Sequence, residues 1–205
     1  MERDYLIVSE KEIREDGYPN AWANNLNGIG ITRLTSYNDL NKAKEQYDKY
    51  QIGDIVCYDV SSHEYQVVPM TPEMLHMLIS EKNSFPYHLL NDKYRDDPEI
   101  LKIVLNSYNP ISARGVYLVS NPISYALPNA LTEENIELAF SKVRPIDIFL
   151  DENGKAVKKA ILEYIKNNYS LSEEKYNSIE NCMEIGGFIH TNVLNELTKK
   201  AAKGR

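Results

Sequence analysis

Residues 71–84 read TPEMLHMLISEKNS, residues 97–110 read DPEILKIVLNSYNP, and residues 132–145 read TEENIELAFSKVRP. Each stretch opens with Thr or Asp, has Glu two positions later, and then places apolar residues at helical spacing. Thr and Asp are favoured helix N-caps, and Glu in the first turn interacts favourably with the helix dipole. These stretches predict one capped helix written three times, with the polar Asn135 weakening the third copy. Internal similarity of this kind is typical of repeat proteins that bind partners.

A proline-led segment precedes the second and third of these helices. FPYHLL at residues 85–90 and NPISYA at residues 121–126 start 36 residues apart, close to the 35 residues between the helices that follow them. The predicted repeating unit is therefore a pair of helices, with a proline opening the first. The first and second capped helices start only 26 residues apart. An interrupted array and the chance similarity of three capped helices both remain open.

This helix pair resembles the ankyrin repeat, whose first helix opens with T-P-L-H-x-A and whose unit recurs about every 33 residues. The best match joins Pro86 and His88 to residues 97–105, which are similar to the L-E-I-V-K-L-L-L run of the family. The chain departs from the family pattern at Pro128, where the first helix of the next unit should end. A partial third unit is expected at residues 151–155 (DENGK), which resemble the ankyrin β-turn. The resemblance covers at most residues 71 to about 185.

The resemblance implies that binding uses the loops between repeats and the concave helical face, and that His88 has a structural role. Residues 111–120 and 146–154 would then project as fingers. The candidate partner-binding residues on these fingers are Arg114, Tyr117, Phe149 and Asp151. The alternative is that apolar residues of the first finger simply pack against the next unit.

Before Pro69 the pattern is mixed and predicts a small α+β unit over residues 1–69. Its expected elements are strands at residues 5–8, 54–60 and 63–68 and a helix within residues 37–50. Residues 17–30 are rich in Asn and Gly and predict an irregular loop. The expected fold class is α+β: this small unit followed by an all-α array of helix pairs over residues 70–205, either ankyrin-like or an irregular bundle. The expected C-terminal helices cover residues 156–168, begin near residue 172, and cover residues 191–202.

Composition limits the classes of function. A net charge of −7 argues against nucleic acid as a partner, because binding a duplex generally needs a basic face. No apolar segment approaches the roughly 20 residues of a membrane-spanning helix. Two cysteines are too few for a disulfide framework and indicate a reducing compartment. We therefore expect a soluble, cytoplasmic protein, or an effector delivered to a host cytosol, with another protein as its partner.

Only one cluster suggests chemistry. Cys57, Asp59 and His63 lie in the predicted hairpin, where a thiol nucleophile would need a nearby base and a group that orients it. In that weaker alternative the chain is an enzyme, the loop carrying Trp22 is a lid, and the helices are scaffold. Cys182 and His190 are too few for a zinc site. No cofactor or metal is expected, and a protein-interaction module (adaptor, inhibitor or effector) is the preferred hypothesis.

Overall fold

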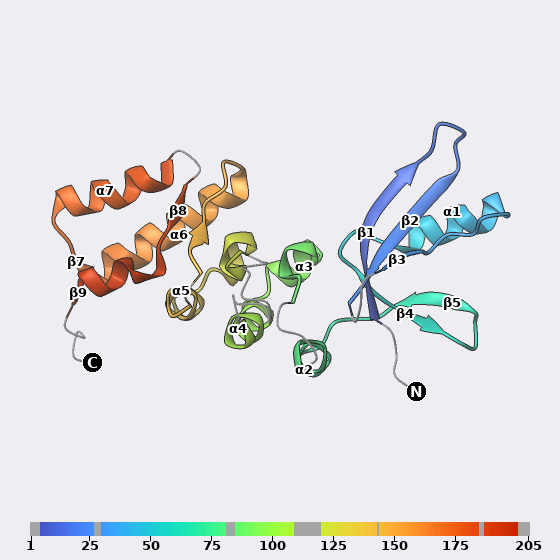
Figure 1. Ribbon diagram of the computed structural model, residues 1–205, viewed down its shortest axis with the longest axis horizontal. Coiled ribbons are helices and arrows are strands. Elements are labelled where there is room, and N and C mark those ends of the chain that lie inside the picture. The colour runs from blue at the N-terminus through green and yellow to red at the C-terminus, as the bar shows by residue number, and fades with distance from the viewer. Residues whose placement is uncertain are drawn as a thin grey trace. The chain divides into compact units, whose positions relative to one another are not determined.

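The computed structural model divides the chain into two compact units, which are described separately (Figure 1). The first unit comprises Met1–Lys82 and Leu89–Tyr94, and the second comprises Asn83–His88 and Arg95–Arg205. The structure describes residues 5–26, 30–80, 85–108, 120–142, 144–184 and 187–200. The fold is α+β, an antiparallel sheet followed by a helical C-terminal part. The helix at Pro72–Ser80 belongs to the first unit, so the division falls later in the chain than residue 69.

A five-stranded sheet in the order β3-β2-β1-β4-β5 forms the first unit, and every neighbouring pair is antiparallel. Its strands are β1 (Tyr5–Ile13), β2 (Pro19–Asn25), β3 (Ile31–Arg33), β4 (Ile55–Asp59) and β5 (Glu64–Val67).

The prediction of an irregular loop over residues 17–30 is wrong, because β2 occupies its centre. Ala21 and Ala23 alternate with Trp22, and both alanines are fully buried. Small alanines among asparagines hide the period-2 pattern that usually identifies a half-buried strand. The strand is stabilised by its register against β1, which pairs Val8 with Ala23 and Lys11 with Ala21.

Helix α1 (Leu40–Lys49) packs against one face of this sheet (Figure 1). The Asp39 side chain caps it by accepting a hydrogen bond from the Lys42 N–H at 3.0 Å. The core beneath it contains Leu6, Val8, Ala21, Ala23, Leu34, Tyr50 and Val56. Leu40, the first residue of the helix, is exposed, whereas the polar Gln46 is buried.

All three repeated stretches form helices: α2 (Pro72–Ser80), α4 (Pro98–Ser107) and α5 (Glu133–Phe140). The predicted caps are confirmed as well. The Asp97 side chain accepts from the Glu99 and Ile100 N–H groups, and the Thr132 side chain accepts from the Asn135 N–H. The Thr71 hydroxyl accepts from the Met74 N–H at 3.3 Å. The shared sequence pattern therefore reflects the same kind of N-cap at the start of each helix.

The proline-led segments before α4 and α5 form short turns in place of full helices. The first contains the 3₁₀ turn η1 (Tyr87–Leu89), and the short helix α3 (Asp92–Arg95) follows it. The second contains the 3₁₀ turn η2 (Pro122–Tyr125), and the 3₁₀ turn η3 (Pro128–Ala130) follows it. Proline lacks an N–H and disfavours helical backbone in the residue before it, so Pro128 ends the first turn and starts the next.

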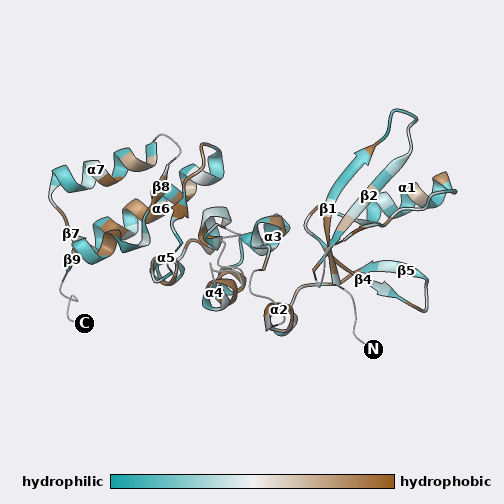
Figure 2. Ribbon diagram, in the orientation of Figure 1, coloured by the Kyte–Doolittle hydropathy of each residue, from teal (hydrophilic) through white to brown (hydrophobic). Residues whose placement is uncertain are grey.

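Two longer helices follow, α6 (Glu152–Asn168) and α7 (Glu173–Glu184). Residues 151–155, expected as a β-turn, instead begin α6: the Asp151 side chain accepts from the Gly154 N–H at 2.7 Å. A side chain at Gly154 would overlap the Phe149 backbone, which explains the glycine. In Figure 2 α7 is largely hydrophilic, and only Ile179 and Met183 on it are buried.

Short strand pairs and a 3₁₀ helix complete the second unit. Strand β6 (Ile146–Asp147) pairs with β8 (Phe188–Ile189), and β7 (Tyr169–Ser170) pairs with β9 (Thr198–Lys199). The predicted helix at residues 191–202 is wrong, since η4 (Thr191–Glu196) is a 3₁₀ helix and β9 follows it. Extended pairing continues beyond β9, because the Asn168 carbonyl accepts a hydrogen bond from the Lys200 N–H at 2.8 Å.

Two buried asparagines connect the segments of the second unit. The Asn135 amide donates to the Pro98 carbonyl at 3.0 Å and to the Ala130 carbonyl at 2.9 Å. The Asn121 amide donates to the Ala139 carbonyl at 3.1 Å and to the Arg144 carbonyl at 3.3 Å. Each amide thus donates hydrogen bonds to main-chain carbonyl groups of neighbouring segments. The polar residue that weakened the third sequence copy is therefore what joins α5 to the start of α4.

Candidate functional site

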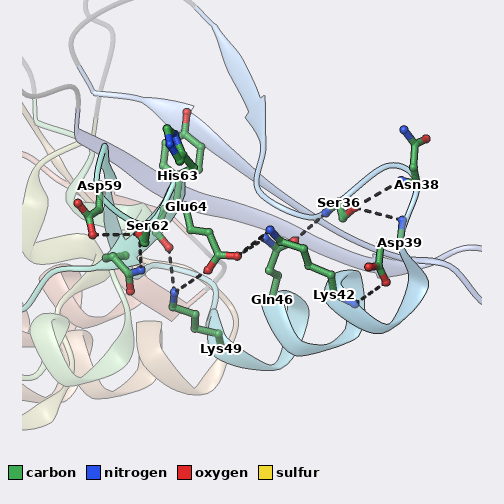
Figure 3. A network of polar contacts seen from close by, with 12 residues as sticks. Ser36, Asn38, Asp39, Lys42, Gln46, Lys49, Asp59, Ser62, His63 and Glu64 are labelled. Atoms are coloured by element: carbon green, nitrogen blue, oxygen red, sulfur yellow. Dashed lines mark hydrogen bonds and ion pairs between the residues drawn. The ribbon is translucent and has the colours of Figure 1, made fainter.

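The predicted hairpin forms, but its three candidate catalytic residues, Cys57, Asp59 and His63, have separate structural roles. The β4–β5 register pairs Cys57 with Gln66 and Asp59 with Glu64, so the connecting turn spans residues 60–63. The Cys57 side chain is buried. Asp59 accepts hydrogen bonds from the Ser61 N–H and the Ser62 hydroxyl, both at 2.9 Å (Figure 3). These two donors lower the pKa of the Asp59 carboxyl and fix the turn.

His63 belongs to the other face of the same hairpin. It is at a positive φ of 55°, and its Nδ1 is 3.4 Å from the hydroxyl of Tyr58. Tyr58 alternates with Cys57 and Asp59 along β4, so its side chain lies on the opposite face of the strand. The imidazole is therefore directed away from the face that carries the thiol and the carboxylate. This geometry gives no support to a Cys57–His63–Asp59 catalytic arrangement.

Trp22, expected on a lid, lies on β2 directly opposite Arg33 of β3. The Arg33 guanidinium lies 4.1 Å from the Tyr37 ring centre and 5.9 Å from that of Trp22. Its Nε donates to the Thr35 hydroxyl at 3.1 Å. Arg33 thus uses both its charge and its hydrogen bonds to secure the end of the sheet, and Trp22 is part of that packing.

Glu64 connects β5 to α1 in the polar network of Figure 3. Its carboxylate lies 3.1 Å from the Lys42 amine and accepts from the Gln46 amide at 3.3 Å. The hydrogen bond from Lys42 lowers the pKa of the Glu64 carboxyl, and Lys49 adds to this effect. Gln46 in turn accepts from the Ser36 N–H at 2.7 Å. This network explains why a glutamine is buried in α1, and it gives these residues a structural role.

In the second unit three rings from distant parts of the chain form a row. The ring centres of His88 and Tyr125 are 5.3 Å apart, and those of Tyr125 and Phe149 are also 5.3 Å apart. His88 is exposed, Tyr125 and Phe149 are half-buried, and the neighbouring Leu150 is 73% exposed. We call His88, Tyr125 and Phe149 the aromatic row, and Leu150 lies beside it in sequence. Large apolar and aromatic side chains gathered at a surface are typical of interaction sites.

Two hydrogen bonds to main-chain carbonyls hold the segment that carries Tyr125. Arg95 donates to the Tyr125 carbonyl at 3.3 Å, and the Asn153 amide donates to the Ser124 carbonyl at 3.2 Å. Although much of the His88 side chain is exposed, the atoms packed around its ring partly desolvate it; this desolvation lowers its pKa, and the charge of Arg95 lowers it further. His88 is therefore driven toward its neutral form, which keeps the row uncharged at neutral pH.

The candidate partner-binding residues have different outcomes. Phe149 belongs to the aromatic row. The Asp151 carboxylate already accepts the hydrogen bond that caps α6. Arg114 and Tyr117 lie outside the described residues. The second expected finger, residues 146–154, is held to the fold by the β6–β8 pair and by α6.

Sequence reasoning missed Tyr125, although NPISYA was singled out as a repeat. The family pattern directs attention to the His position, which is Ser124 in this copy, and the ring lies one residue further on. A search for aromatic residues near each proline-led turn would have found His88 and Tyr125 together.

Cys182 and His190 both line an open groove of about 370 Å³ beside α7. Cys182 is exposed, and the His190 ring packs edge-on against Phe188 with centres 4.9 Å apart. Within the described ranges, no group of three or more His, Cys, Asp or Glu side chains is placed to hold a metal ion. Among the helices that the structure describes, none combines the length and apolar character needed to cross a membrane.

No protein-family model matches this chain, and no curated protein or solved structure matches it either.

Proposed function

We propose that this chain is a protein-interaction module that binds a partner protein through the aromatic row of its second unit. The observation that carries the proposal is the contact of His88, Tyr125 and Phe149, which brings together rings from three separate segments at a partly exposed surface. Aromatic side chains contribute much of the binding energy of protein interfaces, because they bury a large area at little entropic cost.

Three further features support this proposal. Leu150, which follows Phe149 in sequence, adds an apolar side chain that is 73% exposed. The buried amide contacts of Asn121 and Asn135 support a rigid surface, and a rigid surface loses less entropy on binding. The residues that suggested an enzyme, Cys57, Asp59 and His63, have structural contacts of their own. In this account the protein is an adaptor, inhibitor or effector of the cytoplasm or a host cytosol, and its ankyrin-like region presents the row.

Affinity capture with the full chain tests the proposal. Tyr125→Ser and Phe149→Ser remove rings of the row, and we expect each to weaken binding of a captured protein by about tenfold or more. The matched control is Phe188→Ser, because Phe188 is also in the second unit and is 50% exposed but lies outside the row. Captured proteins are identified by mass spectrometry, and the affinity of the purified partner is then measured by calorimetry.

The thermal unfolding of each variant shows whether the fold is intact. A partner retained equally by Tyr125→Ser, Phe149→Ser and Phe188→Ser would contradict the proposal. So would capture of no protein above the level of an unrelated bait.

A further inference from the structure

The two edges of the five-stranded sheet differ in how they are closed. At the β5 edge, the Tyr65 carbonyl accepts hydrogen bonds from the Lys49 amine at 3.1 Å and from the Tyr50 hydroxyl at 2.9 Å. Tyr65 faces away from β4, because the Val68 N–H bonds to the Ile55 carbonyl and main-chain groups alternate along a strand. Side chains from the end of α1 therefore occupy a main-chain group that a further strand would need at this edge.

The opposite edge, β3, is open. The Gly30 carbonyl and the Leu34 N–H both form hydrogen bonds to β2, at 3.0 Å and 2.8 Å. Because main-chain groups of an antiparallel strand alternate between its two sides, Thr32 faces β2 as well, whereas Ile31 and Arg33 face away from it. Within the described part of the chain, no strand other than β2 pairs with β3. The N–H and C=O groups of Ile31 and Arg33 therefore line the open side of this edge.

The side chains along β3 leave this edge accessible. Ile31 is 69% exposed, although it lies within a strand. The Arg33 guanidinium donates to the Thr35 hydroxyl at 3.1 Å and to the Ser36 carbonyl at 3.2 Å. Arg33 is therefore directed along its own chain, away from Thr32, and its charge does not block the middle of the strand. An open edge strand with an exposed apolar side chain is a place where a further strand can pair.

β3 is self-complementary when two copies of the chain meet antiparallel. A twofold axis at Thr32 places Ile31 of each copy opposite Arg33 of the other, and each such pair exchanges both of its N–H···O=C hydrogen bonds. Thr32 then lies opposite Thr32 of the second copy, which is a favourable cross-strand pair, and Ile31 packs against the aliphatic stem of the opposing Arg33. The same three residues supply both halves of the contact, which identifies a second copy of this chain as the occupant.

We propose that two copies of this chain associate through β3 and join their five-stranded sheets into one continuous sheet. A pair of short strands buries much less than the roughly 1,200 Å² of a stable interface, so the dimer forms reversibly at micromolar and higher concentrations. β3 belongs to the first unit and shares no residue with the aromatic row, so the association is independent of the function proposed above.

Sedimentation equilibrium of the full chain at up to about 500 µM tests this association, since small interfaces are weak. Ile31→Pro removes an outward N–H without removing a bond to β2, and edge strands accept proline at such positions. We expect it to weaken dimerisation by about tenfold or more, because one hydrogen bond is lost on each side of the axis. Ile31→Lys keeps the N–H but places a charge opposite Arg33, and it should also weaken the dimer. Its matched control is Val60→Lys, since Val60 is a 63% exposed apolar residue directly after β4.

A cysteine at position 32 tests the register. Opposed residues of a non-hydrogen-bonded pair have Cα atoms about 4.5 Å apart, which is within the range of a disulfide. In a Cys182→Ser background, which removes the exposed native thiol, we expect Thr32→Cys to form an intermolecular disulfide on mild oxidation and Val60→Cys to react far more slowly.

Thermal unfolding shows which variants keep the fold, and Ile31→Lys provides the comparison if Ile31→Pro does not. A chain that stays monomeric over the whole concentration range would overturn the proposal. So would a dimer that the substitutions at Ile31 weaken no more than Val60→Lys does. Equal rates of disulfide formation in Thr32→Cys and Val60→Cys would overturn it as well, because the contact would then not be centred on β3.

Discussion

The two units use polar residues in different ways. In the first unit, side chains at the surface of the sheet hold the helix and turns to it: Glu64 connects β5 to α1, and Asp59 fixes the turn after β4. In the second unit, buried amides join successive segments through main-chain carbonyls, as Asn135 does between α5 and α4. The first arrangement engages Asp59 and His63, and the first unit also exposes aromatic side chains such as Tyr37 and Tyr58. In the second unit, the rings of His88, Tyr125 and Phe149 come from three separate segments and contact one another. This contact between distant segments is why we propose binding at the second unit.

The largest expected effect is at Gly53 in the first unit. This residue has a φ of +84°, and an added Cβ would overlap the backbone of Leu90 and Asn91. We expect Gly53→Ala to lower the free energy of unfolding by about 3 kcal/mol or more, because strain and overlap add. Gly17→Ala is the matched control, since Gly17 also has a positive φ but open space around it; about 1 kcal/mol is expected there. Chemical denaturation measures both, and equal losses would contradict the close approach.

Asn135→Ala tests how the second unit is joined. The substitution leaves the Pro98 and Ala130 carbonyls without their amide donor, and we expect a loss of about 2 kcal/mol in the free energy of unfolding. Asn129→Ala is the control, because Asn129 is exposed and bonds only to Asp96; its loss should stay below about 0.5 kcal/mol. If the two variants were equally stable in urea denaturation, Asn135 would not hold α5 to α4.

The helix caps and Asn135 show what the sequence can and cannot predict. Capped helices were predictable because Asp97 and Thr132 act on N–H groups two or three residues away. The role of Asn135 was not, because its partner Pro98 lies 37 residues away in sequence. Strand β2 was hidden for a similar reason, since asparagines and alanines carry little β propensity and only pairing with β1 defines it.

The candidate site was predictable in part. Phe149 was identified from the expected finger, and His88 was noted for its place in the repeat motif. Their connection through Tyr125 depends on how three segments pack, which no local pattern encodes. The geometry gives no support to the cluster of Cys57, Asp59 and His63: the residues are close in sequence and Cys57 and Asp59 share one face of β4, but the His63 imidazole lies beside Tyr58 on the other face.

Glu64→Gln probes the polar network of the first unit and should have a small effect. Because the pair with Lys42 is partly exposed, we expect a loss of about 0.5 kcal/mol in the free energy of unfolding. The lowered pKa of Glu64 means that its contribution is present above the ordinary Glu value and is lost as pH falls through its folded value. The difference from the unmodified chain should therefore shrink between pH 6 and pH 3.

The smallest effect concerns His88 in the aromatic row. Because its pKa is lowered in the folded state, the unfolded chain binds the proton more readily, and unfolding becomes easier as pH falls below about 6.5. His88→Phe keeps a ring beside Tyr125 but removes the titration. We expect the free energy of unfolding of this variant to fall less between pH 7.5 and pH 5 than that of the unmodified chain. Identical slopes would show that the ring of His88 is fully solvated.

Site-specific photo-crosslinking tests whether the aromatic row binds a partner protein. A benzophenone amino acid replaces Leu150 beside the aromatic row, or Ile13 in the first unit; these side chains are 73% and 66% exposed. We expect a discrete crosslinked partner protein from position 150, absent from position 13 and abolished by Tyr125→Ser together with Phe149→Ser. The same product from both positions, or none from position 150, would contradict the assignment of binding to the aromatic row.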